Sequence, residues 1–235
     1  MKKIMFAVCL FLVVPVICSA QWVLMKTDAD QAVHRGIDYI YNFQFDSAST
    51  EFDYVIRTYP DHPVGYFMEA MVAWWKIDTR TDFRSRQLED EFLAKIEKVI
   101  AVSDKLLEKN KNDIVGLFFK GGAIGYRGRY YATIDKSMIK ALGDGKVALD
   151  IIEQSWNIAP GNKDVLLGMG LYHYFAAVLP DEYPVLKPLM AFFPASDRRG
   201  GLLELKLASE QARYANIEAK AVLLQIYYQF EKDYQ

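Results

Sequence analysis

The stretch AVHRGIDYIYNFQFDSASTEFDYVIRTYPDHPVGY, residues 32–66, holds the pattern that decides the fold. About one helical turn after a small residue comes an aromatic one, and this happens twice: Tyr39 after Gly36, and Phe52 after Ala48. This spacing places each pair on one face of a helix. Small residues let two helix backbones approach closely where they cross, and the aromatic rings fill the space beside the crossing. The stretch therefore predicts two antiparallel helices.

Pro60 closes this unit, because proline lacks an N–H and cannot continue a helix. Ala70 stands 34 residues after Gly36. This spacing resembles the tetratricopeptide repeat (TPR), a helix pair of about 34 residues, although Ala32 and Arg35 replace its usual Trp and Leu. Since one pair cannot bury its apolar face alone, the resemblance implies a stack of pairs. We predict an all-α fold, a TPR-like superhelix of antiparallel helix hairpins.

Weaker copies of the pattern recur. Gly121 and Gly170 each begin a further pair, and Ala148 precedes Pro160 by 12 residues, as in the first copy. The predicted helices cover residues 28–43, 45–58, 88–109, 197–212 and 216–230, with another that begins near Pro63. Asp28 or Asp30 is the predicted N-cap of the first helix.

Four segments interrupt the rhythm. Residues 77–87 are polar and predict an inserted loop, while residues 125–131 and 143–145 predict breaks at glycines. Residues 179–194 contain four prolines among large apolar side chains. That segment cannot be one regular helix, and it is too apolar for a solvated linker. It predicts a packed insertion.

Residues 1–20 have the pattern of a secretory signal peptide, with Lys2 and Lys3 before an apolar run over 4–17 and small residues before Gln21. We expect an exported chain, periplasmic or outer-membrane-associated, with one TPR-like domain over 21–235. A retained anchor is the alternative, but the run is shorter than the roughly 20 residues of a membrane span.

A lipoprotein modified at Cys18 is a further alternative. Cys9 and Cys18 are the two cysteines of the chain. Because both lie in the expected signal, the mature chain would have no disulfide, and its core alone would have to stabilise the fold.

The later motifs carry a second resemblance. They are GYRGR at 125–129, GMGLYHY at 168–174, VLP at 178–180 and DRRGGL at 197–202. These motifs resemble bacterial exported TPR proteins of unassigned function and, more distantly, the eukaryotic TTC39 and Iml2 group of TPR-like proteins. The resemblance implies a helical-repeat fold and little chemistry.

Composition and motifs favour a binding protein over an enzyme. The formal net charge of −2 lacks the basic excess of nucleic-acid binders. The three histidines have no metal-ligand spacing, and the glycines between 121 and 128 are not followed by the Lys-Ser/Thr of a phosphate loop. We therefore predict no catalytic residues, no metal and no cofactor.

The candidate binding residues are arginines and tyrosines in the later motifs. A guanidinium group can grip a carboxylate or phosphate, and tyrosine suits a half-wet contact. They are Arg127, Arg129, Tyr130, Tyr131, Tyr172, Tyr174, Arg198 and Arg199. The structural alternative is that the arginines hold loops by pairing with Asp181, Glu182 or Asp197. On the concave face we expect Tyr39, Tyr66, Lys120 and Tyr174, with the arginines projecting toward the same side.

The leading hypothesis is an exported, non-enzymatic scaffold that binds a peptide or protein partner in the cell envelope. An envelope protein that binds lipid or glycan is the alternative, suggested by the apolar segment 179–194. An enzyme is the remote third. Residues 221–228 look like the first helix of a further pair, so we also expect that more sequence follows or that a partner covers the last helix.

Overall fold

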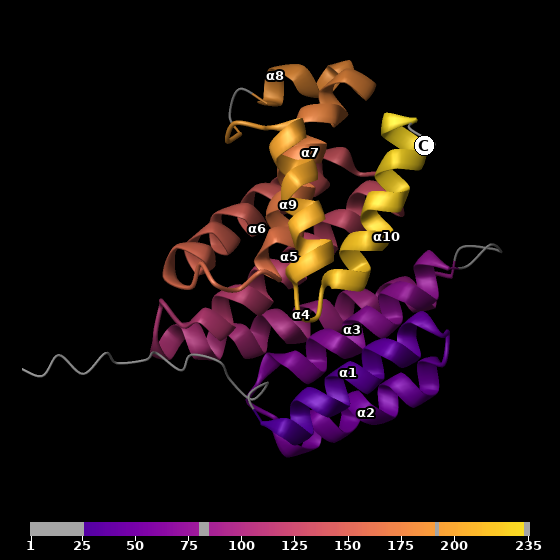
Figure 1. Cartoon of the computed structure of the whole chain (residues 1–235), viewed down its shortest axis with the longest axis vertical. Helices are drawn as coiled ribbons and strands as arrows, with labels where there is room; N and C mark the ends of the chain where they lie inside the picture. The colour runs from indigo at the N-terminus through magenta and orange to yellow at the C-terminus, as the bar shows by residue number, and fades with distance from the viewer. Residues whose placement is uncertain (1–25, 80–84, 191–192, 233–235) are drawn as a thin grey trace, which may run out of the picture.

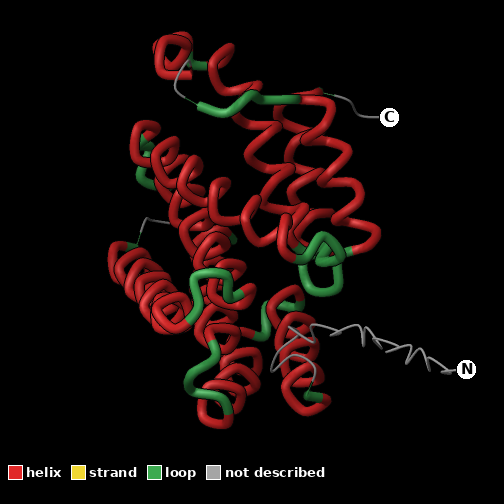
Figure 2. Tube along the Cα trace, turned by 90° about the vertical axis from the view of Figure 1, so that its left-hand side faces the viewer, coloured by secondary structure: helices red, strands yellow, loops and turns green. Residues whose placement is uncertain are grey.

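The structure is a computed structural model that describes residues 26–79, 85–190 and 193–232. Within these residues the chain is helical with no β-strand, as Figure 2 shows. The elements are α1 (Thr27–Tyr41), α2 (Phe45–Thr58), α3 (Pro63–Asp78), α4 (Arg86–Lys109), α5 (Ile114–Thr133), α6 (Met138–Ile158), α7 (Val165–Glu182), η2 (Pro184–Leu186), α8 (Lys187–Met190), α9 (Arg198–Gln211), α10 (Asn216–Ile226) and η3 (Tyr227–Glu231).

Each long helix packs against the next long helix along the chain. In addition, α1 contacts α3, α3 contacts α5, and α5 contacts α7. Side-chain pairs show that α1 and α2, α3 and α4, and α4 and α5 run antiparallel. Tyr41 at the end of α1 packs on Trp75 near the end of α3, and Trp74 lies beneath Arg129 near the end of α5, so α1, α3 and α5 run in one direction. In Figure 1 the stack leads from α1 and α2 at one end to α7–α10 at the other. The predicted all-α superhelix of hairpins is confirmed.

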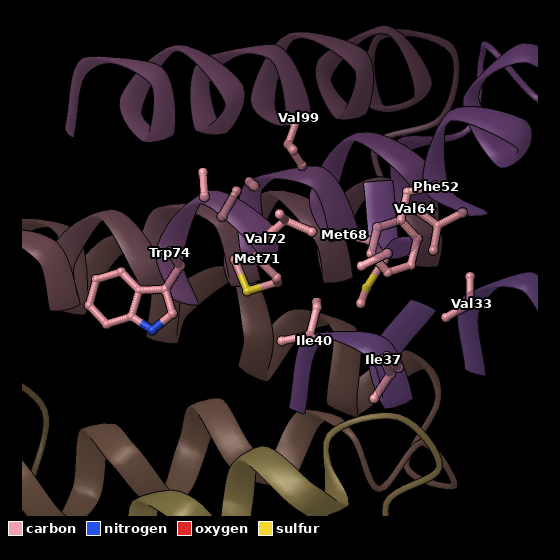
Figure 3. Packing of buried hydrophobic residues seen from close by; sticks show 14 of the residues in the cluster. Val33, Ile37, Ile40, Phe52, Val64, Met68, Met71, Val72, Trp74 and Val99 are labelled. Carbon is pink, nitrogen blue, oxygen red and sulfur yellow. The ribbon is translucent and has the colours of Figure 1, made fainter. Parts of the chain in front are cut away.

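The first crossing is as close as the sequence predicts. Phe52 has no exposed surface, and its ring lies where a side chain at position 36 would be, so Gly36 is required there. The surrounding core joins α1–α5, and Figure 3 shows its side chains meeting between the ribbons. Removal of such apolar surface from water is the main stabilising term in folding.

A second glycine crossing joins α7 to α9. A Cβ atom on Gly201 would lie 2.5 Å from the Tyr174 backbone nitrogen, and one on Gly170 would lie 2.9 Å from the Gly201 carbonyl oxygen. The two backbones touch directly at this point. A separate apolar cluster surrounds the crossing and includes Leu205 and Val222.

Polar side chains cap the starts of α3, α4, α5 and α9. His62 Nδ1 accepts from the Val64 N–H, Asp113 from the Gly116 N–H, and Asp197 from the Arg199 N–H. The predicted cap of the first helix is wrong, since α1 begins at Thr27 with Lys26 as its N-cap. Asp28 and Asp30 lie in the first turn instead, where carboxylates favour the helix dipole.

Two predicted breaks are absent. α5 runs without interruption through 125–131, and α6 runs through 143–145. In α5, Gly128 serves close packing instead, because a Cβ atom there would lie 3.2 Å from the Cβ of Asp144 on α6; Gly143 in α6 faces open space and is simply tolerated within the helix.

Residues 179–194 do form several pieces: α7 continues past Pro180 to Glu182, and then come η2 and α8. The loop predicted at 77–87 is too long at both ends, because α3 runs to Asp78 and α4 begins at Arg86; residues 80–84 lie outside the described residues. The expected signal peptide and both cysteines lie outside the described residues. Among the described helices, none is both long and apolar enough to cross a membrane.

Candidate functional site

The turn between α9 and α10, residues 212–215, reaches back to the first helix. Tyr214 donates its hydroxyl hydrogen to Asp30 at 2.6 Å, and Arg213 forms an ion pair with the same carboxylate at 2.8 Å. The Tyr214 ring also stacks on His34, with 5.0 Å between ring centroids. Residues more than 180 positions apart are thus joined. The superhelix is closed by contacts between its two ends.

This turn is held from the other side by α7. The Asp164 carboxylate accepts hydrogen bonds from the backbone N–H groups of Tyr214 and Ala215, both at 2.8 Å. Although burial opposes it, hydrogen bonds from Tyr214 and Arg213 hold the pKa of Asp30 below its ordinary value. We call residues 212–215 with their partners Asp30 and Asp164 the closing contact.

A second link runs from α10 into the stack. Glu218, which is 5% exposed, accepts from Arg129 Nη1 at 2.6 Å and from the Tyr41 hydroxyl at 3.1 Å. The Arg129 guanidinium lies 4.8 Å above the Trp74 ring. Burial raises the pKa of Tyr41 above its ordinary value, and the negative charge of Glu218 raises it further. An ion pair in such surroundings is costly to break, because its partner would remain buried and charged.

Behind these contacts lies a large cavity of about 850 Å³. Its walls come from α1, α3, α5, α6, α7 and α10, so the inner helices of the stack and α10 line it together, and it is partly open to solvent. Typical lining residues are Ile37, Met68, Met71, Leu171 and Phe175. Small-molecule sites in proteins are concave, mostly apolar and about 300–1,000 Å³ in volume. The cavity has the size and lining of such a site.

One face of α3 follows the cavity along its whole length. Val64, Met68, Met71, Trp75 and Asp78 all line it and recur every three or four residues. With a rise of about 1.5 Å per residue this stripe is about 21 Å long. It is apolar until its last residue.

The structure disperses the predicted arginines. Arg127 pairs with Asp144 through Nε at 2.8 Å and with Glu97 at 2.5 Å. Arg129 turns inward to Glu218, and Arg198 pairs with Glu231 at 2.6 Å. They do not project toward a common side, and their partners are not the predicted Asp181, Glu182 and Asp197. Whether any of these arginines binds a partner stays a prediction; Arg199 is exposed.

The predicted tyrosines are also separated. Tyr130 is buried and donates to Glu89 at 2.8 Å, whereas Tyr131 lies beneath Lys140. Tyr174 has no exposed surface and donates to Glu231 at 2.6 Å.

Of the predicted tyrosines, Tyr172 lines the cavity. Its hydroxyl is buried without a hydrogen-bond partner in the described part of the chain. Burial, with Asp150 and Glu153 nearby, raises its pKa to about 12.

The sequence predicted that the first helix of each pair contributes to the concave face, and named four residues there. The first helices of the pairs do line the cavity, but Tyr39, Tyr66, Lys120 and Tyr174 do not. The stripe on α3 has the helical spacing that a sequence can show, yet that spacing is the same for a packed core face. A search of the described residues finds no group of three or more metal-ligating side chains.

Comparisons with known proteins add little beyond this geometry. No protein-family model matches the chain, and no curated protein matches it. The crystal structure of a thermophilic TPR protein from Thermus thermophilus is similar, with 15% sequence identity and a TM-score of 0.46. The alignment covers 85% of this chain and 81% of that one.

Proposed function

We propose that this chain is a non-enzymatic binding protein that holds an apolar small molecule, of the size and character of a lipid, in its central cavity. The observation that carries the proposal is the cavity itself, which is about 850 Å³ in volume and lined mainly by apolar side chains. Apolar lining favours a lipid over a glycan, because sugar hydroxyls need many polar partners when they are buried. With its signal-like start, the chain would do this as an exported protein of the cell envelope.

The same geometry argues against an open peptide groove. In TPR-like stacks the inner helices form the concave surface, and here α10 and the closing contact cover that surface. A peptide would have to displace α10 and break the buried Arg129–Glu218 pair. A small apolar molecule needs only space that is already present.

The proposal is tested by titration with N-phenyl-1-naphthylamine, a neutral apolar dye that fluoresces when it leaves water. We expect saturable binding to the parent chain. Gly145 lines the cavity, and a Cβ atom added there would lie 4.0 Å from the Tyr172 ring, in ordinary van der Waals contact. A Cβ atom added at Gly143 on the same helix would meet nothing within 4 Å, and Gly143 does not line the cavity. Gly145→Phe should weaken dye binding at least tenfold, and Gly143→Phe should leave it unchanged. No saturable binding to the parent, or equal losses in both variants, would refute the proposal.

A protein-interaction scaffold remains the second candidate, and a different surface favours it. The last helices expose large apolar side chains: Leu203 on α9 is 57% exposed and Leu224 on α10 is 73% exposed. Apolar side chains that gather on a surface mark protein interfaces when they form a continuous patch. Substituting both leucines with Ser should abolish capture of a protein partner while leaving dye binding intact.

A further inference from the structure

At one end of the cavity the direction of the helices creates a polar cluster, which is separate from the charged residues Lys163, Asp164 and Arg213 that also line the cavity. Tyr41 and Asp78 are the last residues of α1 and α3, and Arg129 lies one turn before the end of α5. Since these three helices run parallel, their C-terminal ends lie together. The last carbonyl groups of a helix have no partner within it and carry partial negative charge. The end of the cavity where they meet therefore favours a cation.

The side-chain charges at this end leave one carboxylate without a partner. Arg129 is neutralised by Glu218, with 2.6 Å between Nη1 and Oε1. Asp78 lines the cavity but makes no hydrogen bond or ion pair within the described residues. Burial raises the pKa of the Asp78 carboxyl, the charge of Arg129 lowers it and the charge of Glu218 raises it further. When ionised, Arg129, Glu218 and Asp78 together have a formal charge of −1, and Asp78 carries the excess; Lys136, which follows α5, also lines the cavity.

An aromatic ring stands beside this carboxylate. Trp75 precedes Asp78 by three residues on α3, and both line the cavity, so they share one face of the helix. Tyr41 packs edge-on against Trp75, with ring centroids 5.1 Å apart. A carboxylate next to aromatic faces attracts an organic cation both by charge and by cation–π contact. Below Trp75 the stripe is apolar as far as Val64.

We infer that the cavity takes an amphiphile with a cationic amine headgroup, which pairs with Asp78 while its aliphatic chain lies along the stripe of α3. This inference rests on the proposed function and adds the class of ligand. A fatty acid fits less well at this end, because its carboxylate would meet Asp78 and Glu218 with Arg129 already paired. The other cations that line the cavity are Lys136, Lys163 and Arg213, and dodecanoate in the test below measures whether they hold an acid instead. An alcohol of the same chain length keeps the apolar contacts but gains no charge pair.

The test is competition against bound N-phenyl-1-naphthylamine at pH 7 with dodecylamine, dodecanol and dodecanoate, each below its micellar concentration. The amine is protonated at this pH, as lysine is. We expect dodecylamine to displace the dye at about fivefold lower concentration than dodecanol, which is the factor for one charge pair about 4 Å apart in a water-like dielectric. Dodecanoate should be the weakest competitor.

Asp78→Asn keeps the shape of the side chain and removes its charge, so amine and alcohol should then compete equally when each is compared with the variant's own dye affinity. Asp61→Asn is the matched control, because Asp61 is exposed and does not line the cavity; it should leave the preference intact. A bound dye that amine and alcohol displace equally from the parent, or a preference that survives Asp78→Asn, would overturn the headgroup inference alone. A dye that never binds would overturn the proposed function and this inference with it.

Discussion

The close crossings between neighbouring helices, here called joints, differ from the closing contact in the interactions that hold them. The joints are apolar and tight: Phe52 against Gly36, and the backbone of α9 against that of α7 at Gly201. The closing contact is polar and partly wet, since Arg213 is 61% exposed where it meets Asp30. Apolar burial stabilises in proportion to area, whereas an exposed ion pair contributes little. The stack should therefore hold the fold, and the closing contact should control access to the cavity.

The largest effect should come from emptying an apolar joint. Phe52→Ala removes a fully buried ring, and such truncations cost about 3–5 kcal/mol. Chemical denaturation followed by circular dichroism measures the change. Leu224→Ala, at a position 73% exposed, should stay within about 0.5 kcal/mol of the parent. Similar losses in the two variants would mean that the first hairpin is not part of the core.

A buried histidine gives the joints their own pH response. Burial lowers the pKa of His62 to about 4 from 6.5. Between pH 6.5 and 4 the unfolded chain therefore binds a proton at His62 that the folded chain does not bind. The free energy of unfolding keeps its full value above pH 6.5 and falls as the pH drops toward 4. The loss approaches about 3 kcal/mol.

Denaturation curves at several pH values measure this loss. His62→Asn keeps an acceptor for the Val64 N–H at the start of α3 and should remove the dependence between pH 6.5 and 4. An unchanged pH profile in the variant would show that other groups cause it. Asp30 in the closing contact responds separately: its lowered pKa means that its contribution is lost only below its ordinary value of 3.8.

The second joint can be tested with a matched pair of glycines. Gly201→Ala would force the α7 and α9 backbones apart, because the new Cβ lies 2.5 Å from the Tyr174 nitrogen. We expect a loss of about 1–3 kcal/mol. Gly143→Ala enters open space on α6 and should instead gain up to about 1 kcal/mol from helix propensity. Thermal unfolding shows whether each variant is less or more stable than the parent. Higher stability in both variants would contradict the close crossing of α7 and α9.

The smallest effect on stability should come from the closing contact. The double variant Arg213→Ala/Tyr214→Phe removes the Arg213 and Tyr214 hydrogen bonds to Asp30, at a cost of about 1–2 kcal/mol in total. Dye release should nevertheless become faster, and release from the parent should quicken with added salt. Arg35→Ala breaks the comparably exposed Arg35–Glu51 pair between α1 and α2 and should leave dye release unchanged. Equal release rates in all three proteins would show that the closing contact does not control access.

The sequence predicts the joints better than it predicts the closure, for a physical reason. The spacing of Gly36 and Phe52 is local, so a pattern within 35 residues predicts α1, α2 and their crossing. The predicted breaks in α5 and α6 failed because glycine is read as a helix breaker, while Gly128 is needed for close approach to α6. The bond between Asp30 and Tyr214 spans 184 positions, and no local periodicity contains it. Because Tyr214 also lines the cavity, local sequence patterns do not predict the cavity either.

The claim that the closed stack holds an aliphatic ligand is tested most directly by photo-crosslinking. A dodecylamine analogue with a diazirine in its chain would be bound, irradiated, and its attachment sites found by mass spectrometry. The account predicts labels on the cavity-facing residues of α1, α3, α5 and α7, such as Ile37, Met68, Met71 and Phe175, with labelling lost in Gly145→Phe. Labels confined to exposed side chains such as Leu203 and Leu224, and unaffected by Gly145→Phe, would contradict it.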